Sequence, residues 1–314
     1  MSINDKPLVS IVMITYGHEK YIREAIEGVF LQKTNFSVEL IISNDCSPDN
    51  TDEIVKEIIP NAPENIKVKY IRHSNNLGMI ANHQWAIGQA CGKYIVTIDG
   101  DDYWINKNKL QIQVDFLEQN PDYAICCHNF KILNGEILEE KSFLDELEIQ
   151  ETSTIEDLSK NNIIGTLTAV CKNEKVVFPE WTKDAPLGDL ILFLNIAKKG
   201  KIKYFNEKWA VYRKNVGVWH SNKVNHKKMI ELYHNLANDF SENKAVRDNL
   251  HLREKRHIKA FLKNQTIAEM FKSQYFKKLT YFEKVKLLIM NLSKQVNKLI
   301  DNQPLNSKIG GGVK

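Results

Sequence analysis

The feature that most constrains the fold is a regular alternation of apolar runs and amphipathic segments over the first hundred residues. The apolar runs are short and rich in β-branched residues, as buried strands are. In the segments between them, the apolar residues recur at helical spacing. This alternation predicts an α/β protein with a mostly parallel sheet that carries helices on both faces. The expected strands cover residues 8–14, 38–45, 66–71 and 93–98, and the expected helices cover 21–30, 51–58 and 80–90.

The pattern is less regular after residue 105, and from about residue 224 it is helical. We expect one domain over residues 1–222, with halves at about 1–105 and 106–222. A basic helical extension should follow over 223–305, and a disordered, glycine-containing tail over 306–314. Within the second half, helices are expected at 109–119, 154–160 and 190–197, and strands at 123–128, 166–170, 202–205 and 209–213.

Composition excludes several classes of protein. The chain has 314 residues, 43% of them hydrophobic, and its net charge of +4 does not argue for a nucleic-acid partner. Its five cysteines show no CxxC spacing, which favours a reduced compartment over a disulfide framework or a zinc site. No basic N-terminal region precedes an apolar one, and no apolar run reaches the ~18 residues of a spanning helix. We therefore expect a cytoplasmic protein.

Three carboxylates surround one glycine where the fourth expected strand ends, in Asp99-Gly100-Asp101-Asp102. Carboxylates this close together repel one another unless a cation lies between them or water solvates them fully. One hypothesis is therefore a divalent metal site that holds a diphosphate, and the other is a solvated turn.

Two other expected strands also end in polar residues, at Thr15-Tyr16 and at Asp45. Parallel strands present their carboxyl ends at one edge of the sheet, where ligands bind in such folds. These residues should therefore converge on the same crevice as the acidic turn.

Short motifs follow one another along the first two thirds of the chain. They are Val9-Ser10-Ile11-Val12, Thr15-Tyr16, Ile42-Ser43-Asn44-Asp45, Ser47, Asp49, Thr51, Asn76-Leu77-Gly78, Asn82, Gly92-Lys93-Tyr94, Asp99-Gly100-Asp101-Asp102, Gly188-Asp189, Tyr212-Arg213 and His220. Their order and spacing resemble those of a family 2 glycosyltransferase of the bacterial surface-polysaccharide type. The resemblance implies a GT-A type, Rossmann-like fold with a nucleotide-sugar half at 1–105 and an acceptor half at 106–222. Gly188 departs from the family pattern, which commonly has Glu at that place.

The resemblance implies transfer of a sugar, with inversion, from a nucleotide-diphosphate donor such as a UDP-sugar to a hydroxyl of a glycan. Asp101 and Asp99 would hold Mn²⁺ or Mg²⁺, which would bridge the phosphates and act as a Lewis acid on the leaving oxygen. His220 would be a third ligand, although a lone histidine is more often a packing residue. Asp102 would instead hold its loop by accepting hydrogen bonds from backbone amides.

The remaining donor residues follow the same resemblance. Asp45 resembles the family residue that accepts the N3–H of uracil, although an Asx-turn explains it equally well locally. Thr15 and Tyr16 would lie along the base, and Asn76 belongs to the same nucleotide-binding set. Arg213 would pair with the diphosphate, or with an acidic neighbour such as Glu207.

Asp189 is the candidate general base, which would take the proton of the acceptor hydroxyl. It stands just before an apolar helix, where Asp is also a favoured N-cap. Trp181 and Trp219 are candidate platforms on which the sugar rings stack. The acceptor would be a glycan or a lipid-linked oligosaccharide.

The C-terminal extension is strongly basic. From Arg253 onward there are fourteen lysines and arginines against four acidic residues, and two apolar stripes run through the same segment. One interpretation is a helical extension that packs on the domain or forms a homodimer interface. The other is an interfacial contact of residues 253–305 with the anionic inner face of the cell membrane.

Two other functions fit parts of the pattern. A sugar nucleotidyltransferase would need a glycine-rich, basic loop after the first strand, and Thr15-Tyr16-Gly17-His18-Glu19 is not such a loop. A non-catalytic nucleotide-sugar-binding assembly protein is compatible with Gly188 in the acidic pair.

Overall fold

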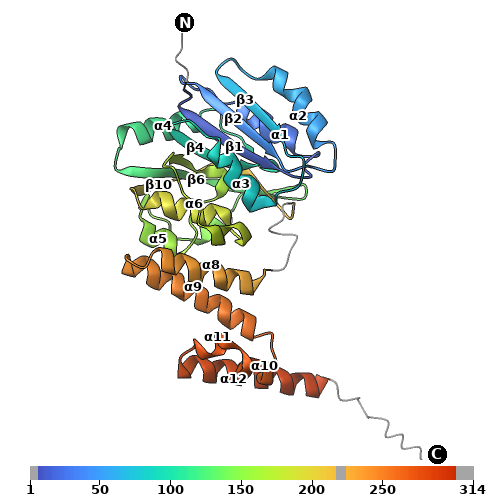
Figure 1. Cartoon of the computed structure of the whole chain (residues 1–314), viewed down its shortest axis with the longest axis vertical. Coiled ribbons are helices and arrows are strands. Elements are labelled where there is room, and N and C mark those ends of the chain that lie inside the picture. The colour runs from blue at the N-terminus through green and yellow to red at the C-terminus, as the bar shows by residue number, and fades with distance from the viewer. Residues whose placement is uncertain (1–5, 217–223, 302–314) are drawn as a thin grey trace, which may run out of the picture.

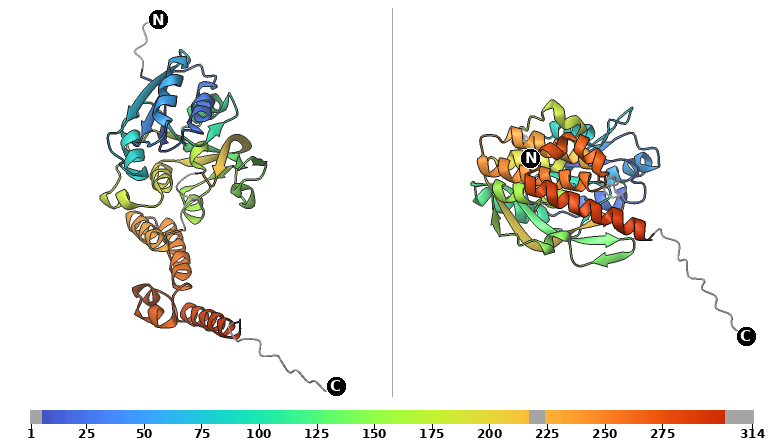
Figure 2. Two further views of the ribbon diagram at one scale, coloured as in Figure 1. Left: turned by 90° about the vertical axis from the view of Figure 1, so that its right-hand side faces the viewer. Right: turned by 90° about the horizontal axis from the view of Figure 1, so that it is seen from below.

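The computed structural model describes residues 6–216 and 224–301, with side chains in the last helix described to residue 293. An α/β body forms the upper part of the molecule, and helices project from it as a column (Figure 1). Figure 2 shows the same separation from a second direction, with the last helices farthest from the sheet. No helix in the described part of the chain is both long enough and apolar enough to cross a bilayer.

The described strands form one sheet. They are β1 (Val9–Thr15), β2 (Val38–Asn44), β3 (Ile66–Arg72), β4 (Tyr94–Asp99), β5 (Tyr103–Trp104), β6 (Tyr123–Asn134), β7 (Ile137–Glu139), β8 (Thr152–Ser153), β9 (Val170–Lys172) and β10 (Lys201–Lys214). Their order is β3-β2-β1-β4-β9-β6-β10-β5, with β7 beside β6 and β8 beside β10. The first four strands are parallel, as predicted. The second half is mixed, because β5, β7, β8 and β9 run antiparallel to their neighbours.

The helices alternate with the strands in the body and then follow one another to the end. The helices and 3-10 turns are α1 (Ile22–Phe30), α2 (Thr51–Ile58), η1 (Ile59–Asn61), α3 (Met79–Gly88), α4 (Lys109–Gln119), η2 (Phe143–Glu146), α5 (Ile155–Lys160), η3 (Thr166–Thr168), η4 (Glu180–Asp184), α6 (Gly188–Ala197), α8 (His226–Asp239), α9 (Lys244–Leu262), α10 (Ile267–Lys272), α11 (Gln274–Lys277) and α12 (Tyr281–Asp301).

Two local predictions were wrong. The two short strands expected at 202–205 and 209–213 are one strand, β10, whose register to β6 shifts on either side of Lys208. The polar residues Asn206 and Glu207 interrupt the apolar pattern there, so the continuity is invisible in the sequence. The strand expected at 166–170 begins as the 3-10 turn η3 and becomes extended only at Val170.

The protein has two apolar cores. The large core fills both faces of the sheet, and every residue of β1 is buried in it. The small core lies between α8, α9 and the last helices, where Leu262, Met270 and Leu279 are buried. The N-terminal part of α9 rests on α5, because Asn249 donates hydrogen bonds to Glu156 O and Ser159 Oγ. The column is therefore anchored to the body through α5.

Candidate active site

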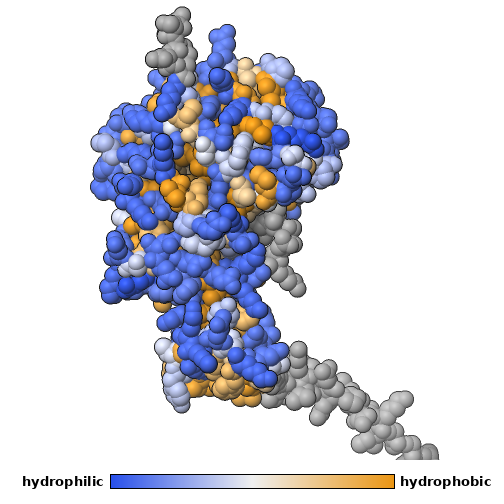
Figure 3. Space-filling view, viewed as in Figure 1, coloured by the Kyte–Doolittle hydropathy of each residue, from blue (hydrophilic) through white to orange (hydrophobic). Residues whose placement is uncertain are grey.

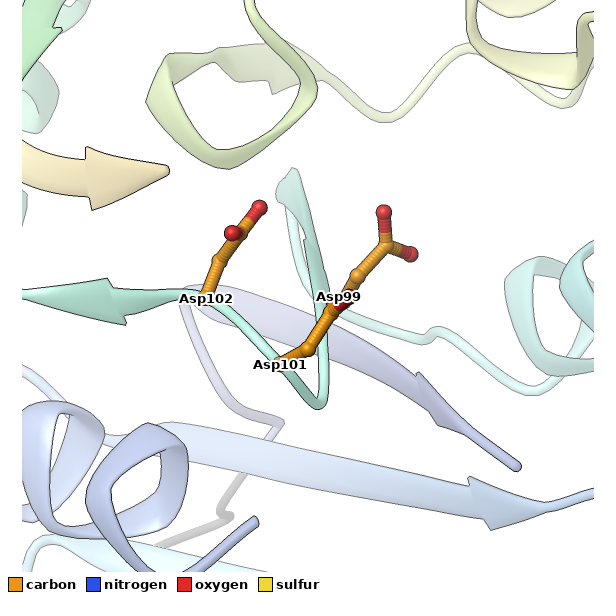
Figure 4. Close-up of side chains that lie close together, drawn as sticks. All are labelled: Asp99, Asp101 and Asp102. Atoms are coloured by element: carbon orange, nitrogen blue, oxygen red, sulfur yellow. The ribbon is translucent and has the colours of Figure 1, made fainter. Parts of the chain in front are cut away.

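The acidic turn after β4 brings its three carboxylates together. One oxygen each from Asp99, Asp101 and Asp102 lies within 4.8 Å of the other two, and Figure 4 shows the three side chains on one turn. Gly100 lets the turn lie against β1, since a Cβ at that position would stand 2.8 Å from Thr15 Oγ1. The turn and the end of β1 therefore form one site, as the strand ends predict.

Burial makes the charge on this turn costly. Desolvation raises the pKa of Asp99 to about 8, and the charges of Asp101 and Asp189 add to the shift. Burial and the charges of Asp101 and Asp99 also raise the pKa of Asp102. A divalent cation would offset this repulsion, and an all-oxygen donor set suits a hard ion such as Mg²⁺ or Mn²⁺. The residues present therefore fit the metal that the family pattern implies.

Asp102 and Arg213 connect the acidic turn to β10. Asp102 Oδ1 accepts a 2.9 Å hydrogen bond from the backbone amide of Arg213, which confirms that Asp102 binds a backbone N–H. The Arg213 guanidinium donates to Asp101 O and forms an ion pair with Glu24. Arg213 therefore does pair with an acidic side chain, but the predicted partner, Glu207, was wrong. The register of β10 turns Arg213 toward α1, where Glu24 lies. Arg213 is 7% exposed, and through these two contacts its guanidinium holds the acidic turn in place.

Asp45 joins the two loops that follow β2 and β3. Its carboxylate, 3% exposed, accepts hydrogen bonds from the amides of Leu77 (2.7 Å) and Gly78 (3.0 Å). The Asx-turn suggested for Asp45 was wrong, because its carboxylate bonds to the loop after β3, and the backbone amide of Ser47 donates instead to Asn44 Oδ1 at 2.8 Å.

Asn76 completes this junction from the loop after β3. Its Nδ2 donates to Asp45 O at 3.3 Å, and its Oδ1 accepts from Gly78 N at 2.9 Å. The structure thus brings Asp45 and Asn76 together, as their common assignment to the nucleotide predicts.

His18 follows the end of β1 and lies beside the acidic turn, although its sequence context predicted no role for it. His18 lies 3.1 Å from Thr15 Oγ1 through Nδ1, and its Nε2 lies 3.9 Å from Asp101 Oδ2. Burial lowers the pKa of His18, and the charge of Asp101 opposes that shift only in part, so the ring is neutral near pH 7. Tyr16 is 45% exposed beside it. The position of His18 just beyond the end of an expected strand could have identified it as a site residue.

Asp189 faces the acidic turn from α6. Its Oδ1 accepts from Leu190 N at 2.7 Å, and its Oδ2 accepts from Thr166 Oγ1 at 3.1 Å. It stands in the first turn of α6 and not at the N-cap, which is Leu187. Burial raises the pKa of Asp189, whose own charge raises the pKa of Asp99. The candidate base and the candidate metal ligands therefore belong to one site.

Tyr212 lies among all of these carboxylates. Burial raises the pKa of its phenol, and the charges of Asp102, Asp101, Asp99 and Asp189 raise it further. The phenol is thus neutral at pH 7, within electrostatic range of the acidic turn. Only its place before Arg213 in a family motif could have drawn attention to it.

Gly188 has a steric explanation. A Cβ at this position would stand 3.0 Å from Ile80 Cδ1 and 3.4 Å from His83 Nδ1, so α3 occupies the space that a glutamate would need. Burial lowers the pKa of His83 to about 4 and keeps its ring neutral. In this chain, any side chain at position 188 would therefore press on α3.

Three predicted site residues remain, namely Trp181, Trp219 and His220. Trp181 donates from Nε1 to Asp239 Oδ2 at 3.2 Å, which ties η4 to the end of α8. His220 and Trp219 lie outside the described residues, and their predicted roles stay predictions.

Comparisons with known proteins agree with this arrangement. Residues 10–172 match the family model described as Glycosyl transferase family 2. An uncharacterized protein of Mycobacterium tuberculosis is 32% identical over 224 residues, which are 71% of this chain and 64% of that relative. This chain therefore spans less than two thirds of that relative's length. The Escherichia coli UDP-Glc:alpha-D-GlcNAc-diphosphoundecaprenol beta-1,3-glucosyltransferase WfgD is 29% identical, over 77% of this chain and 90% of that protein.

Solved structures resemble the fold at low sequence identity. S. aureus TarS 1-349 in complex with UDP-GlcNAc gives a TM-score of 0.60 at 19% identity, covering 93% of this chain and 83% of that chain. The mannosyltransferase PcManGT from Pyrobaculum calidifontis, in complex with GDP-Man and Mn²⁺, gives 0.53 at 16% identity, covering 96% and 89%. These similarities confirm the GT-A type α/β fold.

Proposed function

Because the chain belongs to glycosyl transferase family 2, we propose that it is a metal-dependent, inverting glycosyltransferase that moves a sugar from a nucleotide-diphosphate donor to a glycan hydroxyl. One observation carries the proposal: Asp99 and Asp101 offer oxygens to one cluster of carboxylates, and Asp189 lies near enough for its charge to raise the pKa of Asp99. Metal-dependent inverting transfer uses this combination, a cation site for the leaving diphosphate and a carboxylate base beside it.

On the donor side, Asp101 and Asp99 would hold Mn²⁺ or Mg²⁺. When bound, the metal would neutralise the leaving diphosphate. Asp45, Asn76, Thr15 and Tyr16 would hold the nucleoside, because they border the same edge of the sheet. The solved complexes of TarS with UDP-GlcNAc and of PcManGT with GDP-Man support a nucleotide-sugar donor, and the name of WfgD supports uridine.

On the acceptor side, Asp189 would accept the proton of the attacking hydroxyl. The hydrogen bonds from Leu190 N and Thr166 Oγ1 fix the orientation of its carboxylate. A pKa raised by burial makes it a stronger base than an exposed aspartate, while it remains ionised once the pH exceeds that pKa. His220 would approach the diphosphate from the segment that follows β10.

The names of the relatives support a role in cell-surface glycan synthesis. WfgD acts on a diphosphoundecaprenol-linked acceptor, and a poly(ribitol-phosphate) beta-N-acetylglucosaminyltransferase, TarS of Staphylococcus aureus, also matches this chain. We assign a glycan or lipid-linked oligosaccharide as the acceptor on this basis.

The tip of the helical column would contact an anionic membrane surface. Tyr281, Phe282, Ile289 and Leu292 of α12 are exposed by 84%, 79%, 58% and 49%. Figure 3 shows apolar surface gathered at this lower end of the molecule. Exposed lysines such as Lys286 lie on the same helix, and a basic, apolar helical face suits an anionic lipid surface. A homodimer through the same face is the alternative.

The test of the proposed activity is the metal dependence of donor binding and turnover. Asp101→Asn should weaken Mn²⁺-dependent binding of a UDP-sugar by about 100-fold, because the metal supplies several kcal/mol. Asp115→Asn, which changes an exposed carboxylate on α4, is the matched control and should bind like the wild type. Binding without any release of UDP would favour the non-catalytic assembly protein. Binding by the wild type that is indifferent to metal would contradict the proposal.

A further inference from the structure

Four cationic or ionisable side chains gather on the two helices below α6. Arg253, Arg256 and His257 lie on α9 at positions i, i+3 and i+4, which share one helix face. His226 of α8 approaches them, with its Nδ1 3.0 Å from Nδ1 of His257. We call this group the basic cluster. In Figures 1 and 2, α8 and α9 lie directly beneath α5 and α6.

The basic cluster is built around a buried tyrosine. The Arg253 guanidinium lies 4.6 Å from the ring centroid of Tyr233, and the His257 ring stacks on the same ring at 5.5 Å. Tyr233 is only 2% exposed. Arg253 also donates from Nη1 to Ser159 O at 3.5 Å, which attaches it to α5. Arg253 and His257 are therefore held in place by packing, whereas Arg256 on the same helix face is exposed.

The basic cluster forms no ion pair with a described acidic side chain. Among the described residues, none of its four side chains has a carboxylate oxygen within 4.0 Å. Burial, with the charges of His226, Arg253 and Arg256, lowers the pKa of His257 to about 4. A bound anion would relieve this repulsion.

The cluster is electrostatically connected to the candidate base. The charge of Arg253 lowers the pKa of Asp189, which opposes the larger effect of burial. The charge of Asp189 raises the pKa of Tyr233 in turn. A group held by Arg253 would therefore lie within electrostatic range of the carboxylate that is proposed to take the acceptor proton.

We propose that the basic cluster is a phosphate subsite of the acceptor, which positions the hydroxyl to be glycosylated beside Asp189. This inference rests on the proposed function and specifies the chemistry of its acceptor. Guanidinium groups bind phosphate oxygens through charge-assisted, bidentate hydrogen bonds, and imidazole N–H groups add further donors. The phosphate would be either a diphosphate that links a glycan to a lipid or a phosphodiester within a polyol chain.

The first experiment measures binding of inorganic phosphate to the full chain without divalent metal, by ³¹P line broadening. Arg256→Gln should weaken binding about tenfold or more, because it removes a charge-assisted hydrogen-bond donor from the subsite. Arg256 is exposed, so its replacement should not disturb folding. Lys228→Gln removes an exposed charge from α8 and should bind phosphate like the wild type. Equal binding by wild type and Arg256→Gln, or an equal loss in Lys228→Gln, would overturn the inference.

The second experiment distinguishes the source of the phosphate and separates the inference from the proposed function. Release of UDP from a UDP-sugar with Mn²⁺ and water reports the donor site alone. Farnesyl diphosphate and glycerophosphoglycerol are added as competitors, and stronger inhibition by one supports the corresponding lipid or polyol source. Inhibition should weaken about tenfold in Arg256→Gln. If the enzyme releases UDP and neither compound inhibits that release, the phosphate subsite is overturned. If the enzyme releases no UDP but binds phosphate in a way that depends on Arg256, only the proposed activity is overturned.

Discussion

The carboxylate of Asp102 accepts its 2.9 Å hydrogen bond from an amide 111 residues further along the chain, that of Arg213. The bond fastens the acidic turn to β10 where the pairing of β5 with β10 involves only two residue pairs. Asp102 therefore positions the turn, whereas Asp99 and Asp101 are the carboxylates that we propose as ligands of the cation. This division of roles within one motif follows from which side chain meets the backbone of β10.

Two substitutions of Asp102 should distinguish the contribution of its hydrogen bond to stability from the contribution of its charge. Asp102→Ala leaves the buried Arg213 amide without a partner, so the free energy of unfolding should fall by about 1–3 kcal/mol. Asp102→Asn keeps a carbonyl acceptor and removes a repelled carboxylate, so it should be at least as stable as Asp102→Ala and close to the wild type. Urea denaturation of the metal-free proteins measures both values. Equal destabilisation by the two variants would contradict the assignment.

Asp189→Asn should abolish transfer and preserve donor binding. Loss of a general base lowers the rate by about 10²- to 10⁴-fold, while the affinity for the UDP-sugar with Mn²⁺ should stay the same. Because burial raises the pKa of Asp189, the wild-type rate should fall with decreasing pH at a higher pH than an ordinary aspartate would cause. Asp184→Asn, at an exposed position of η4, is the control. An unchanged transfer rate in Asp189→Asn would refute the base.

Lys109 predicts a pH dependence of stability that does not involve the carboxylates of the acidic turn. It is fully buried against Trp104, with Nζ 4.2 Å from the ring centroid, and burial lowers its pKa to about 7. Between pH 7 and about 10.5 the unfolded chain binds this proton and the folded chain does not, so stability should rise with pH across that window.

Lys109→Met should remove that pH dependence. It should also stabilise the protein at pH 7 by on the order of 2 kcal/mol, because an amine without a described hydrogen-bond partner leaves the core. Thermal denaturation at several pH values measures both effects. A slope that persists in Lys109→Met would show that another group is responsible.

Phe282→Asp should weaken membrane contact. Removing one buried aromatic side chain costs roughly 1.5–3 kcal/mol, so sedimentation with phosphatidylglycerol vesicles should fall about tenfold or more. Val177→Asp changes a side chain of the body that is 84% exposed and should sediment like the wild type. Raised salt should weaken the wild-type contact. Failure of the wild type to bind these vesicles, or a dimer that Phe282→Asp dissociates in sedimentation velocity, would replace the membrane with the homodimer.

The sequence predicted those features that short-range patterns specify. The fully buried run Val9–Thr15 and the acidic turn at Asp99 identified the parallel half of the sheet and its functional edge, because strand ends in such a sheet converge. The β6–β10 half was harder, because Asn206 and Glu207 break the apolar pattern inside a continuous strand.

Long-range side-chain partners could not be predicted. Glu24 pairs with Arg213 across 189 residues, and His18 reaches Asp101 only once β1 and β4 are adjacent. Nothing local to Arg213 favours Glu24 over Glu207. The packing of Gly188 against His83 is also a tertiary matter, decided by how α3 meets α6.

The helix α9 has a further consequence for the choice of acceptor. Arg253 lies beside the body, and from Arg253 to its last residue, Leu262, the helix rises ~1.5 Å per residue, or ~14 Å, toward the exposed tip. A rigid helix of this kind sets the distance between a surface that holds the tip and the active site. With the tip resting on a lipid surface, only acceptors whose growing end stands about that far above the lipid would reach Asp189, so chain length itself would become a criterion for glycosylation.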